Sequence, residues 1–297
     1  MDTILKTRDL TKKFGNNLAV NQVSMNIQKG DIYGFIGKNG AGKTTFMRMI
    51  LSLARPTEGE IELFSDRDLG KNLHRVGSLI EAPGLYNKAT AQENLYRFAK
   101  LYGSDPGRIP EILDFVGLGN TQNKKAGAFS LGMRQRLGIA IAMLGDPEFM
   151  VLDEPVNGLD PAGMREVRNL ILRLNQERGI TVLISSHLLE ELSKLVTRYG
   201  IINNGTLIEE ITASELEEKS GKYIKISVDQ GPRAAEILGT IVAPEKIQLQ
   251  GNEIRVLSDF DKAGLMNQTL VKEGIMVDSL YAQTRGLEEY FMARIGG

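Results

Sequence analysis

Residues 37 to 45 read GKNGAGKTT and match the pattern G-x-x-x-x-G-K-[ST]. Glycines in such a loop let successive backbone N–H groups turn toward phosphate oxygens, and the dipole of the following helix adds to the attraction. Lys43 is expected to reach the β and γ oxygens of a nucleotide, and the Thr44 hydroxyl to bind Mg²⁺. A glycine-rich turn without a ligand is the alternative, but an expected strand precedes the motif and an expected helix follows it, as phosphate binding requires. The residues expected to contact the nucleotide here are Gly37, Lys38, Asn39, Gly40, Ala41, Gly42, Lys43, Thr44 and Thr45.

Two neighbouring acids follow a second apolar run, FMVLDEP. Asp153 can hold Mg²⁺ directly or through water, and Glu154 can orient or deprotonate an attacking water molecule. An acid pair at the end of a strand is weak evidence when it stands alone. Together with a phosphate-binding loop, it predicts hydrolysis of a nucleoside triphosphate.

A third acid, Glu81, ends the run VGSLIEAP, in which Pro83 stops a strand or helix from continuing. An isolated glutamate is most often an ordinary solvated loop residue. The position of Glu81 relative to the other motifs decides whether it is such a loop residue or part of the nucleotide site.

Three further motifs narrow the interpretation. The segment FSLGMRQRLGIA (residues 129–140) resembles the signature motif of ATP-binding cassette (ABC) ATPases, and PVNGLDP resembles their D-loop, at residues 157–160. ISSHLLEEL places His187 where that family has its switch histidine. The order of all the motifs is that of the family, and the resemblance extends over roughly residues 4 to 212.

The resemblance implies that ATP and Mg²⁺ are the cofactors and that two cassettes enclose two ATP molecules. Ser130 and Gly132 are then expected to contact the γ-phosphate bound by the other cassette, while Ser130 also has the residue type of a helix N-cap. His187 is expected to sense the γ-phosphate, although a lone histidine is most often structural. His74 has no such motif around it and is expected to be a surface residue.

The resemblance also implies a place for adenine. Phe14 stands where these ATPases have an aromatic residue that stacks on the base, and Val20 is expected to flank the base. The alternative for Phe14 is an ordinary core position ahead of a strand.

Glu81 departs from the family, because most of these cassettes have glutamine at this position. That glutamine contacts the metal and the attacking water, and its loop receives the coupling helix of the membrane subunit. The glutamate accepts hydrogen bonds only, adds negative charge and is a harder oxygen ligand for Mg²⁺. The resemblance therefore implies that Glu81 contacts the metal together with Thr44 and Asp153. This variant, and the C-terminal LEEYFMARIGG, resemble the ATPase subunits of bacitracin-type and lantibiotic self-protection exporters.

The elements that must position these residues follow an α/β pattern. Short apolar runs that end in polar residues are typical of buried parallel strands, and helical spacing separates them. We expect an α/β fold: a P-loop NTPase cassette of ABC type over residues 1–220, with a mixed sheet, a β-rich N-terminal part and a helical subdomain. Residues 221–297 show the order β-α-β-β-α-β and then a short helix over 286–297, which is the ferredoxin-like pattern of a small α+β accessory domain. The expected elements of this domain are strands at 223–229 and 275–282, helices at 232–241 and 261–274, and a hairpin over 246–258 that turns at 251–252.

The composition limits the partners. Because 36 basic and 37 acidic residues nearly cancel, no nucleic-acid partner is expected. There is no cysteine, and no apolar stretch approaches the ~20 residues of a membrane-spanning helix. The composition therefore favours the cytoplasm, without a signal peptide, and the resemblance implies a peripheral protein at the cytoplasmic face of the membrane.

The leading hypothesis is the ATP-hydrolysing subunit of an ABC exporter for an antimicrobial peptide or drug. Its expected partners are a second ATP-binding cassette, as a homodimer, and separately encoded multi-span permease subunits. The alternative is a soluble ABC ATPase that acts on a ribosomal, nucleic-acid or regulatory partner. A regulator that binds nucleotide without hydrolysis conflicts with the intact Asp153, Glu154 and His187.

Overall fold

The computed structural model describes residues 2–220, 222–284, 290–292 and 294. Packing divides the chain into two compact units, Met1–Ala213 and Ser214–Gly297, which are described separately. This division lies before the boundary expected at residue 220, so almost all of helix α8 (Ala213–Ser220) belongs to the second unit.

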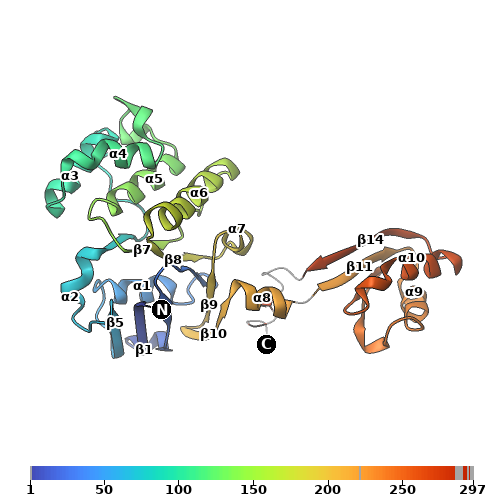
Figure 1. Cartoon of the computed structure of the whole chain (residues 1–297). Coiled ribbons are helices and arrows are strands. Elements are labelled where there is room, and N and C mark those ends of the chain that lie inside the picture. The colour runs from blue at the N-terminus through green and yellow to red at the C-terminus, as the bar shows by residue number, and fades with distance from the viewer. Residues whose placement is uncertain (1, 221, 285–289, 293, 295–297) are drawn as a thin grey trace. The chain divides into compact units, whose positions relative to one another are not determined.

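The N-terminal part of the first unit is a four-stranded antiparallel sheet, drawn in blue in Figure 1. Its longest strand pairs with each of the other three, which explains the β-rich pattern of the sequence there. These strands are β1 (Thr3–Phe14), β2 (Asn17–Val23), β3 (Asn26–Gln28) and β5 (Glu58–Leu63).

A second, six-stranded sheet forms the centre of this unit, in the order β10-β9-β4-β8-β7-β6. Five of the strands are parallel and β10 is antiparallel at the edge, so the sheet is mixed, as predicted. Strands β4, β7 and β8 are buried at every residue, which accounts for their unbroken apolar runs. The six strands are β4 (Ile32–Ile36), β6 (Val76–Leu79), β7 (Phe149–Asp153), β8 (Thr181–Ser186), β9 (Arg198–Asn203) and β10 (Thr206–Thr212).

The parallel order brings the motifs to one edge of this sheet. Strands β4, β8, β7 and β6 are consecutive neighbours, and all of their carboxyl ends face the same way. The phosphate-binding loop follows β4, His187 follows β8, Glu154 follows β7, and Glu81 comes shortly after β6. The arrangement is that of α/β proteins, in which ligands bind beyond the carboxyl ends of the strands.

Seven α-helices of the first unit connect these strands, and α3 to α6 gather in a separate helical part (Figure 1). Local sequence fixes their ends: Asp160 accepts a hydrogen bond from Gly163 N at the start of α6, and Gly179 ends that helix in the left-handed conformation. The helices are α1 (Lys43–Ile50), α2 (Leu69–Asn72), α3 (Ala91–Tyr102), α4 (Ile109–Phe115), α5 (Leu131–Ala142), α6 (Pro161–Arg178) and α7 (Leu189–Ser193).

Helix α1 ends at Ile50, although apolar residues continue at helical spacing through residues 51–54. Ser52 has φ +57°, and Leu53 N donates to Arg48 O at 2.8 Å. This closure ends the helix as a left-handed C-terminal motif does.

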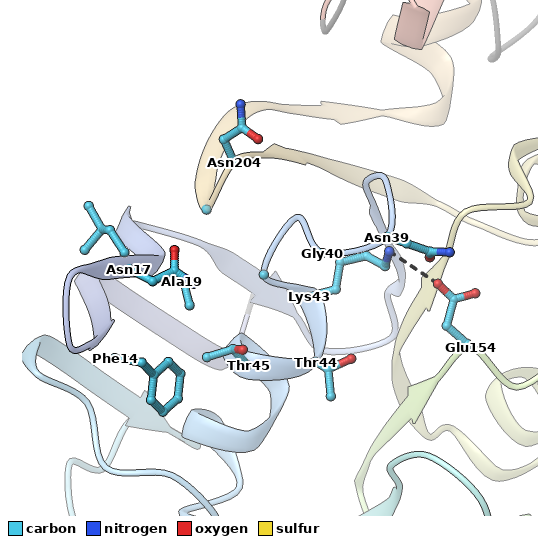
Figure 2. Close-up of a pocket in the computed structure, with 13 residues that line it drawn as sticks. Phe14, Asn17, Ala19, Asn39, Gly40, Lys43, Thr44, Thr45, Glu154 and Asn204 are labelled. Carbon is cyan, nitrogen blue, oxygen red and sulfur yellow. Dashed lines mark ion pairs between the residues drawn. The ribbon is translucent and has the colours of Figure 1, made fainter.

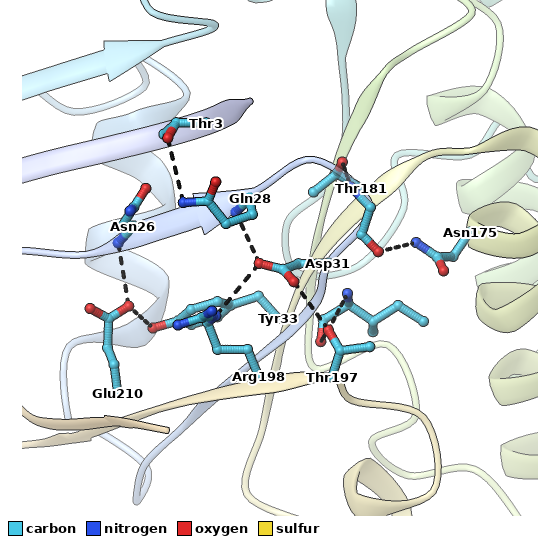
Figure 3. Close-up of polar contacts among 12 residues, drawn as sticks. Thr3, Asn26, Gln28, Asp31, Tyr33, Asn175, Thr181, Thr197, Arg198 and Glu210 are labelled. Atoms are coloured by element: carbon cyan, nitrogen blue, oxygen red, sulfur yellow. Dashed lines mark hydrogen bonds and ion pairs between the residues drawn. The ribbon is translucent and has the colours of Figure 1, made fainter. Parts of the chain in front are cut away.

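A polar network closes the amino end of the central sheet (Figure 3). The Tyr33 hydroxyl donates to Glu210 Oε1 at 2.7 Å, and Asn26 N donates to the same oxygen at 3.3 Å. Arg198 Nε lies 3.7 Å from Asp31 Oδ2. Burial, and then the Glu210 carboxylate, raise the pKa of Tyr33 well above its ordinary value. The network joins β3, β4, β9 and β10.

The second unit has an antiparallel four-stranded sheet in the order β12-β13-β11-β14. Its apolar core includes Ile224 and Ile226 of the sheet and Leu238, Met266 and Leu270 of two helices. The predicted hairpin turn at 251–252 is confirmed by the pairing of β12 with β13. The predicted C-terminal helix over 286–297 lies largely outside the described residues. The elements are β11 (Lys222–Val228), α9 (Gly231–Leu238), β12 (Ile247–Gln250), β13 (Glu253–Val256), α10 (Ala263–Lys272) and β14 (Val277–Thr284).

In the part of the chain that the structure describes, no helix has the length and apolar character needed to cross a membrane.

Candidate active site

The loop between β4 and α1 has the backbone that its glycines predict. Gly40 has φ +81° and Gly42 has φ +105°, values that side chains disfavour. A Cβ atom on Gly42 would lie 2.3 Å from the Ala19 carbonyl oxygen. Only glycine fits there, because the loop passes so close to strand β2.

Lys43 is almost fully buried, with its ammonium group inside the loop. Its Nζ donates to Gly37 O at 2.7 Å and to Lys38 O at 3.3 Å, and lies 3.3 Å from Glu154 Oε1. These partners compensate the charge, and phosphate oxygens can replace them.

The buried Asp153 accepts two hydroxyl hydrogen bonds at the end of β7. Thr44 Oγ1 donates to Asp153 Oδ2 at 2.7 Å, and Ser185 Oγ donates to Asp153 Oδ1 at 2.5 Å. The structure thus brings together Thr44 and Asp153, two of the three residues expected to bind Mg²⁺. Ser185 was not anticipated, although a polar residue inside the buried run TVLISS is a signal that it has a partner.

Glu154 and His187 are brought together as well. Glu154 Oε2 lies 2.8 Å from His187 Nδ1, and Glu154 N donates to Ser185 Oγ at 2.8 Å. The backbone of Glu154 is left-handed, with φ +49°, a strained conformation for a residue with a side chain. The carboxylate is therefore held between Lys43 and His187.

Lys43, Thr44 and Glu154 line a cavity of about 480 Å³, shown in Figure 2, whereas Asp153 and His187 are not part of its lining. Phe14 lines it with 54% of its surface exposed, which excludes a core position for this ring. Among the residues expected from sequence, the lining includes Phe14, Asn39, Gly40, Gly42, Lys43, Thr44, Thr45 and Glu154.

Val20 is a correction, because its side chain is fully buried in the core instead of flanking the cavity. The pairing of β2 with β1 shifts register between Leu18 and Val20, and Leu18 and Ala19 line the cavity in place of Val20.

Asn204 and Gly205, in the turn between β9 and β10, also line the cavity and were missed from sequence. Gly205 N donates to Ala41 O at 3.0 Å, which holds this turn against the phosphate-binding loop. The dipeptide Asn-Gly signals a tight turn, but nothing in it indicates which distant loop the turn will contact.

Glu81 does not line the cavity, and its contact with the metal stays a prediction. Its carboxylate is instead exposed and forms an ion pair with Arg48 of helix α1. No local motif indicates this partner, because exposed ion pairs depend on tertiary packing.

Ser130 and Gly132 do not line the cavity of their own chain. Ser130 is the N-cap of α5, where its side chain accepts a hydrogen bond from Met133 N at 3.2 Å. The cap role is confirmed, and the exposed Ser130 hydroxyl is open to a partner. His74 is exposed, as expected of a surface residue.

The donor set suits Mg²⁺ bound together with a nucleotide. Among the described residues there is no group of three or more His, Cys, Asp or Glu side chains placed to hold a metal. Mg²⁺ commonly uses one or two protein oxygens and completes its shell with water and substrate phosphates. Thr44 lines a cavity wide enough for a nucleotide, and its hydroxyl donates to the Asp153 carboxylate, so these two oxygens fit that pattern.

Comparisons with known proteins agree with this geometry. Residues 20–157 match the family described as ABC transporter. The chain is 44% identical to the bacitracin transport ATP-binding protein BcrA of Bacillus licheniformis, over 100% of this chain and 99% of that protein. It is 42% identical to the lantibiotic transport ATP-binding protein SrtF of Streptococcus pyogenes, over 70% of this chain and 90% of that protein.

A solved structure, the dimeric ATP-binding cassette MJ0796 bound to ADP and Pi, is similar to the chain with a TM-score of 0.62 and 27% identity. The match covers 71% of this chain and 99% of that one. The predicted P-loop cassette fold with a mixed sheet is thereby confirmed.

Proposed function

This chain belongs to the ATP-binding proteins of ABC transporters, and we propose that it powers the export of an antimicrobial peptide or drug through separate membrane subunits. It is an ATPase that binds ATP with Mg²⁺. The observation that carries the export proposal is the 44% identity, over the whole chain, to a protein described as a bacitracin transport ATP-binding protein. No reported relative supports a soluble ATPase acting on a ribosomal, nucleic-acid or regulatory partner.

The loop from Gly37 to Thr45 is proposed to hold the ATP phosphates. Its support is the pair of left-handed glycines and the buried Lys43, whose present partners are the loop's own carbonyls. Thr44 and Asp153 are proposed to hold Mg²⁺, supported by their mutual hydrogen bond. When bound, Mg²⁺ supplies positive charge to the phosphate oxygens of the transferred group.

Glu154 is proposed as the general base that orients and deprotonates the attacking water. It lines the cavity, and His187 and Lys43 hold its two carboxylate oxygens. His187 is proposed to keep Glu154 in place and to contact the γ-phosphate.

Phe14 is proposed to stack on adenine, since its exposed ring lines one wall of the cavity (Figure 2).

Ser130 and Gly132 are proposed to complete the site of a second copy of the chain. The exposed Ser130 stands at the N-terminus of a twelve-residue helix, and a helix N-terminus favours anions. The dimeric form of the similar cassette MJ0796 supports a homodimer. Multi-span permease subunits at the cytoplasmic face of a membrane are the remaining proposed partners.

Residues 221–297 are proposed to be a ferredoxin-like accessory domain. Its support is the element order β-α-β-β-α-β and the antiparallel strand order β12-β13-β11-β14.

The test of this function is to purify the chain with its membrane subunits in lipid and to measure ATP hydrolysis with and without candidate peptides. Bacitracin and lantibiotics are expected to stimulate hydrolysis, while an unrelated cationic peptide serves as control. A complex that hydrolyses ATP equally with every peptide and transports none would overturn the export proposal.

A further inference from the structure

The loop that carries Glu81 is held firmly on one side by helix α5. Strand β6 ends at Leu79, and both Leu79 and Pro83 pack on Gly138 of α5. A Cβ atom on Gly138 would lie 2.9 Å from each of these two side chains, so the contact is as close as a glycine allows. The residues that bracket Glu81 are therefore fixed to the helix that begins at Ser130.

The other side of the loop is held by Asn94 of α3, which is fully buried. Its Oδ1 accepts from Tyr86 N at 2.8 Å, and its Nδ2 donates to Tyr86 O at 3.2 Å and to Thr90 O at 2.8 Å. One amide thus uses both ends to fix the backbone that follows the Glu81 loop.

Glu81 itself is different, because its side chain is 63% exposed and its backbone is left-handed, with φ +63°. Among the described residues, its only ion pair is with Arg48, which is 45% exposed. Exposed ion pairs are weak and screened by salt, so another cation can readily replace the guanidinium. Glu81 is free to change partner while its neighbours stay in place.

Arg48 lies four positions after Thr44 on α1, and residues at this spacing are neighbours on one face of a helix. Thr44 donates to Asp153, so Arg48 stands one helical turn from the pair proposed to hold Mg²⁺. Arg48, the cation that pairs with Glu81, thus lies on the same helix as Thr44, a residue of the proposed metal site.

We propose that Arg48 is a positioning residue that holds Glu81 away from the magnesium ligands until Mg²⁺ and ATP bind, so that Arg48 and Mg²⁺ compete for one carboxylate. This inference rests on the metal contact that the sequence predicts for Glu81, which we propose as part of the same Mg²⁺ site as Thr44 and Asp153. It also explains why a glutamate suits this position, since a neutral glutamine forms a weaker bond with a guanidinium group.

The test measures how Mg²⁺ promotes binding of a fluorescent, non-hydrolysable ATP analogue to the full chain. Arg48→Gln removes the competitor and is expected to lower the Mg²⁺ concentration for half-maximal binding about two- to fivefold, the range of an exposed ion pair. Arg48→Lys retains the charge and is expected to stay near wild type. In a Glu81→Gln background, Arg48→Gln is expected to have no further effect.

Arg67→Gln is the matched control. Arg67 is also an exposed arginine paired with glutamates, Glu60 and Glu62, but it lies outside the site. It is expected to leave the Mg²⁺ dependence unchanged.

A second readout needs neither metal nor nucleotide. Hydrogen exchange of the amides of residues 80 to 82 in the nucleotide-free chain is expected to be faster in Arg48→Gln than in wild type. Equal exchange in the two proteins would overturn the inference.

The outcomes separate the two proposals. One outcome overturns the inference but keeps the metal role of Glu81. In it, Glu81→Gln changes the Mg²⁺ dependence, and Arg48→Gln changes it equally in the wild-type and Glu81→Gln backgrounds. Arg48 then acts on Mg²⁺ binding through its positive charge alone and not through Glu81. If Glu81→Gln leaves the Mg²⁺ dependence unchanged, the proposed metal role of Glu81 fails, and the competition with it.

Discussion

Two polar clusters occupy opposite ends of the same parallel strands, and they differ in what their groups face. At the amino end, Tyr33 donates to Glu210 and its hydroxyl lies 2.3 Å from the place where a Cβ atom on Gly200 would be, so there is no room for a ligand (Figure 3). At the carboxyl end, Lys43 and Glu154 pair beside a cavity of about 480 Å³ (Figure 2). Hydrogen bonds and ion pairs therefore close the amino end. At the carboxyl end, the paired groups lie beside open space and can exchange their partners for a ligand.

The backbone shows the same contrast. Glu154 and Glu81 both have positive φ at or near the carboxyl end, whereas Asp31, Tyr33 and Glu210 of the amino end do not. Left-handed side-chain residues are strained and gather where function fixes them. We therefore expect substitutions in the carboxyl-end cluster to lower ATP binding or hydrolysis, and substitutions in the amino-end cluster to lower the free energy of unfolding.

Glu154→Gln should have the largest effect, on turnover alone. Removing a general base typically slows a reaction by about 10²–10⁴-fold. We expect that loss in steady-state ATP hydrolysis, with ATP binding and the melting temperature retained. Turnover at the wild-type rate would remove Glu154 from the proposed mechanism.

Tyr33→Phe should have the opposite profile. It leaves Glu210 without its buried hydroxyl donor, which costs about 1–3 kcal/mol in the free energy of unfolding. Urea unfolding should show this loss, while ATP hydrolysis per folded molecule stays unchanged. Tyr102→Phe, at an exposed tyrosine, is the control, and an equal loss there would contradict the account.

Phe14 and Val20 offer a smaller contrast within one hairpin. Phe14→Ala removes the exposed ring and should raise the dissociation constant of ATP about 2- to 10-fold without changing stability. Val20→Ala empties a fully buried site and should lower stability without changing ATP affinity. Equilibrium ATP binding and urea unfolding should be measured on both variants. A loss of stability in Phe14→Ala together with a loss of ATP affinity in Val20→Ala would contradict the assignment.

The smallest expected effect is one of pH. Burial and Glu210 raise the pKa of Tyr33, so above about pH 10 the unfolded chain loses a proton that the folded chain keeps. The stability from Tyr33 is fully present below that pH and falls as the pH rises. The difference in unfolding free energy between wild type and Tyr33→Phe should therefore shrink from about pH 9 to about pH 11. A constant difference would place the Tyr33 pKa near its ordinary value.

Most residues of the candidate site, at the carboxyl end of the central sheet, could be predicted from the sequence. Each belongs to a short motif at the end of a parallel strand. The loop at Gly37–Thr45, Asp153, Glu154 and His187 each come directly after a strand, and the sheet order alone brings them together. Parallel pairing of the strands was enough to predict that these residues lie close together.

The remaining contacts depend on tertiary packing that the sequence does not encode locally. Val20 turns inward where the pairing of β2 with β1 shifts register between Leu18 and Val20. Glu81 meets Arg48, and the turn at Asn204 meets the phosphate-binding loop, across long separations in the chain. Ser185 bonds the Asp153 carboxylate and the backbone N of Glu154, and its place in a buried strand signals a partner without indicating which one.

The central claim is that the groups around Lys43 exchange their present partners for bound ATP. The most direct test compares the free energy of unfolding with and without Mg²⁺ and a non-hydrolysable ATP analogue, for wild type and Lys43→Met. At about 100 times its dissociation constant, the ligand should stabilise wild type by about 2.7 kcal/mol and, at the same concentration, leave Lys43→Met almost unchanged. Equal stabilisation of both proteins, or none of wild type, would contradict the claim.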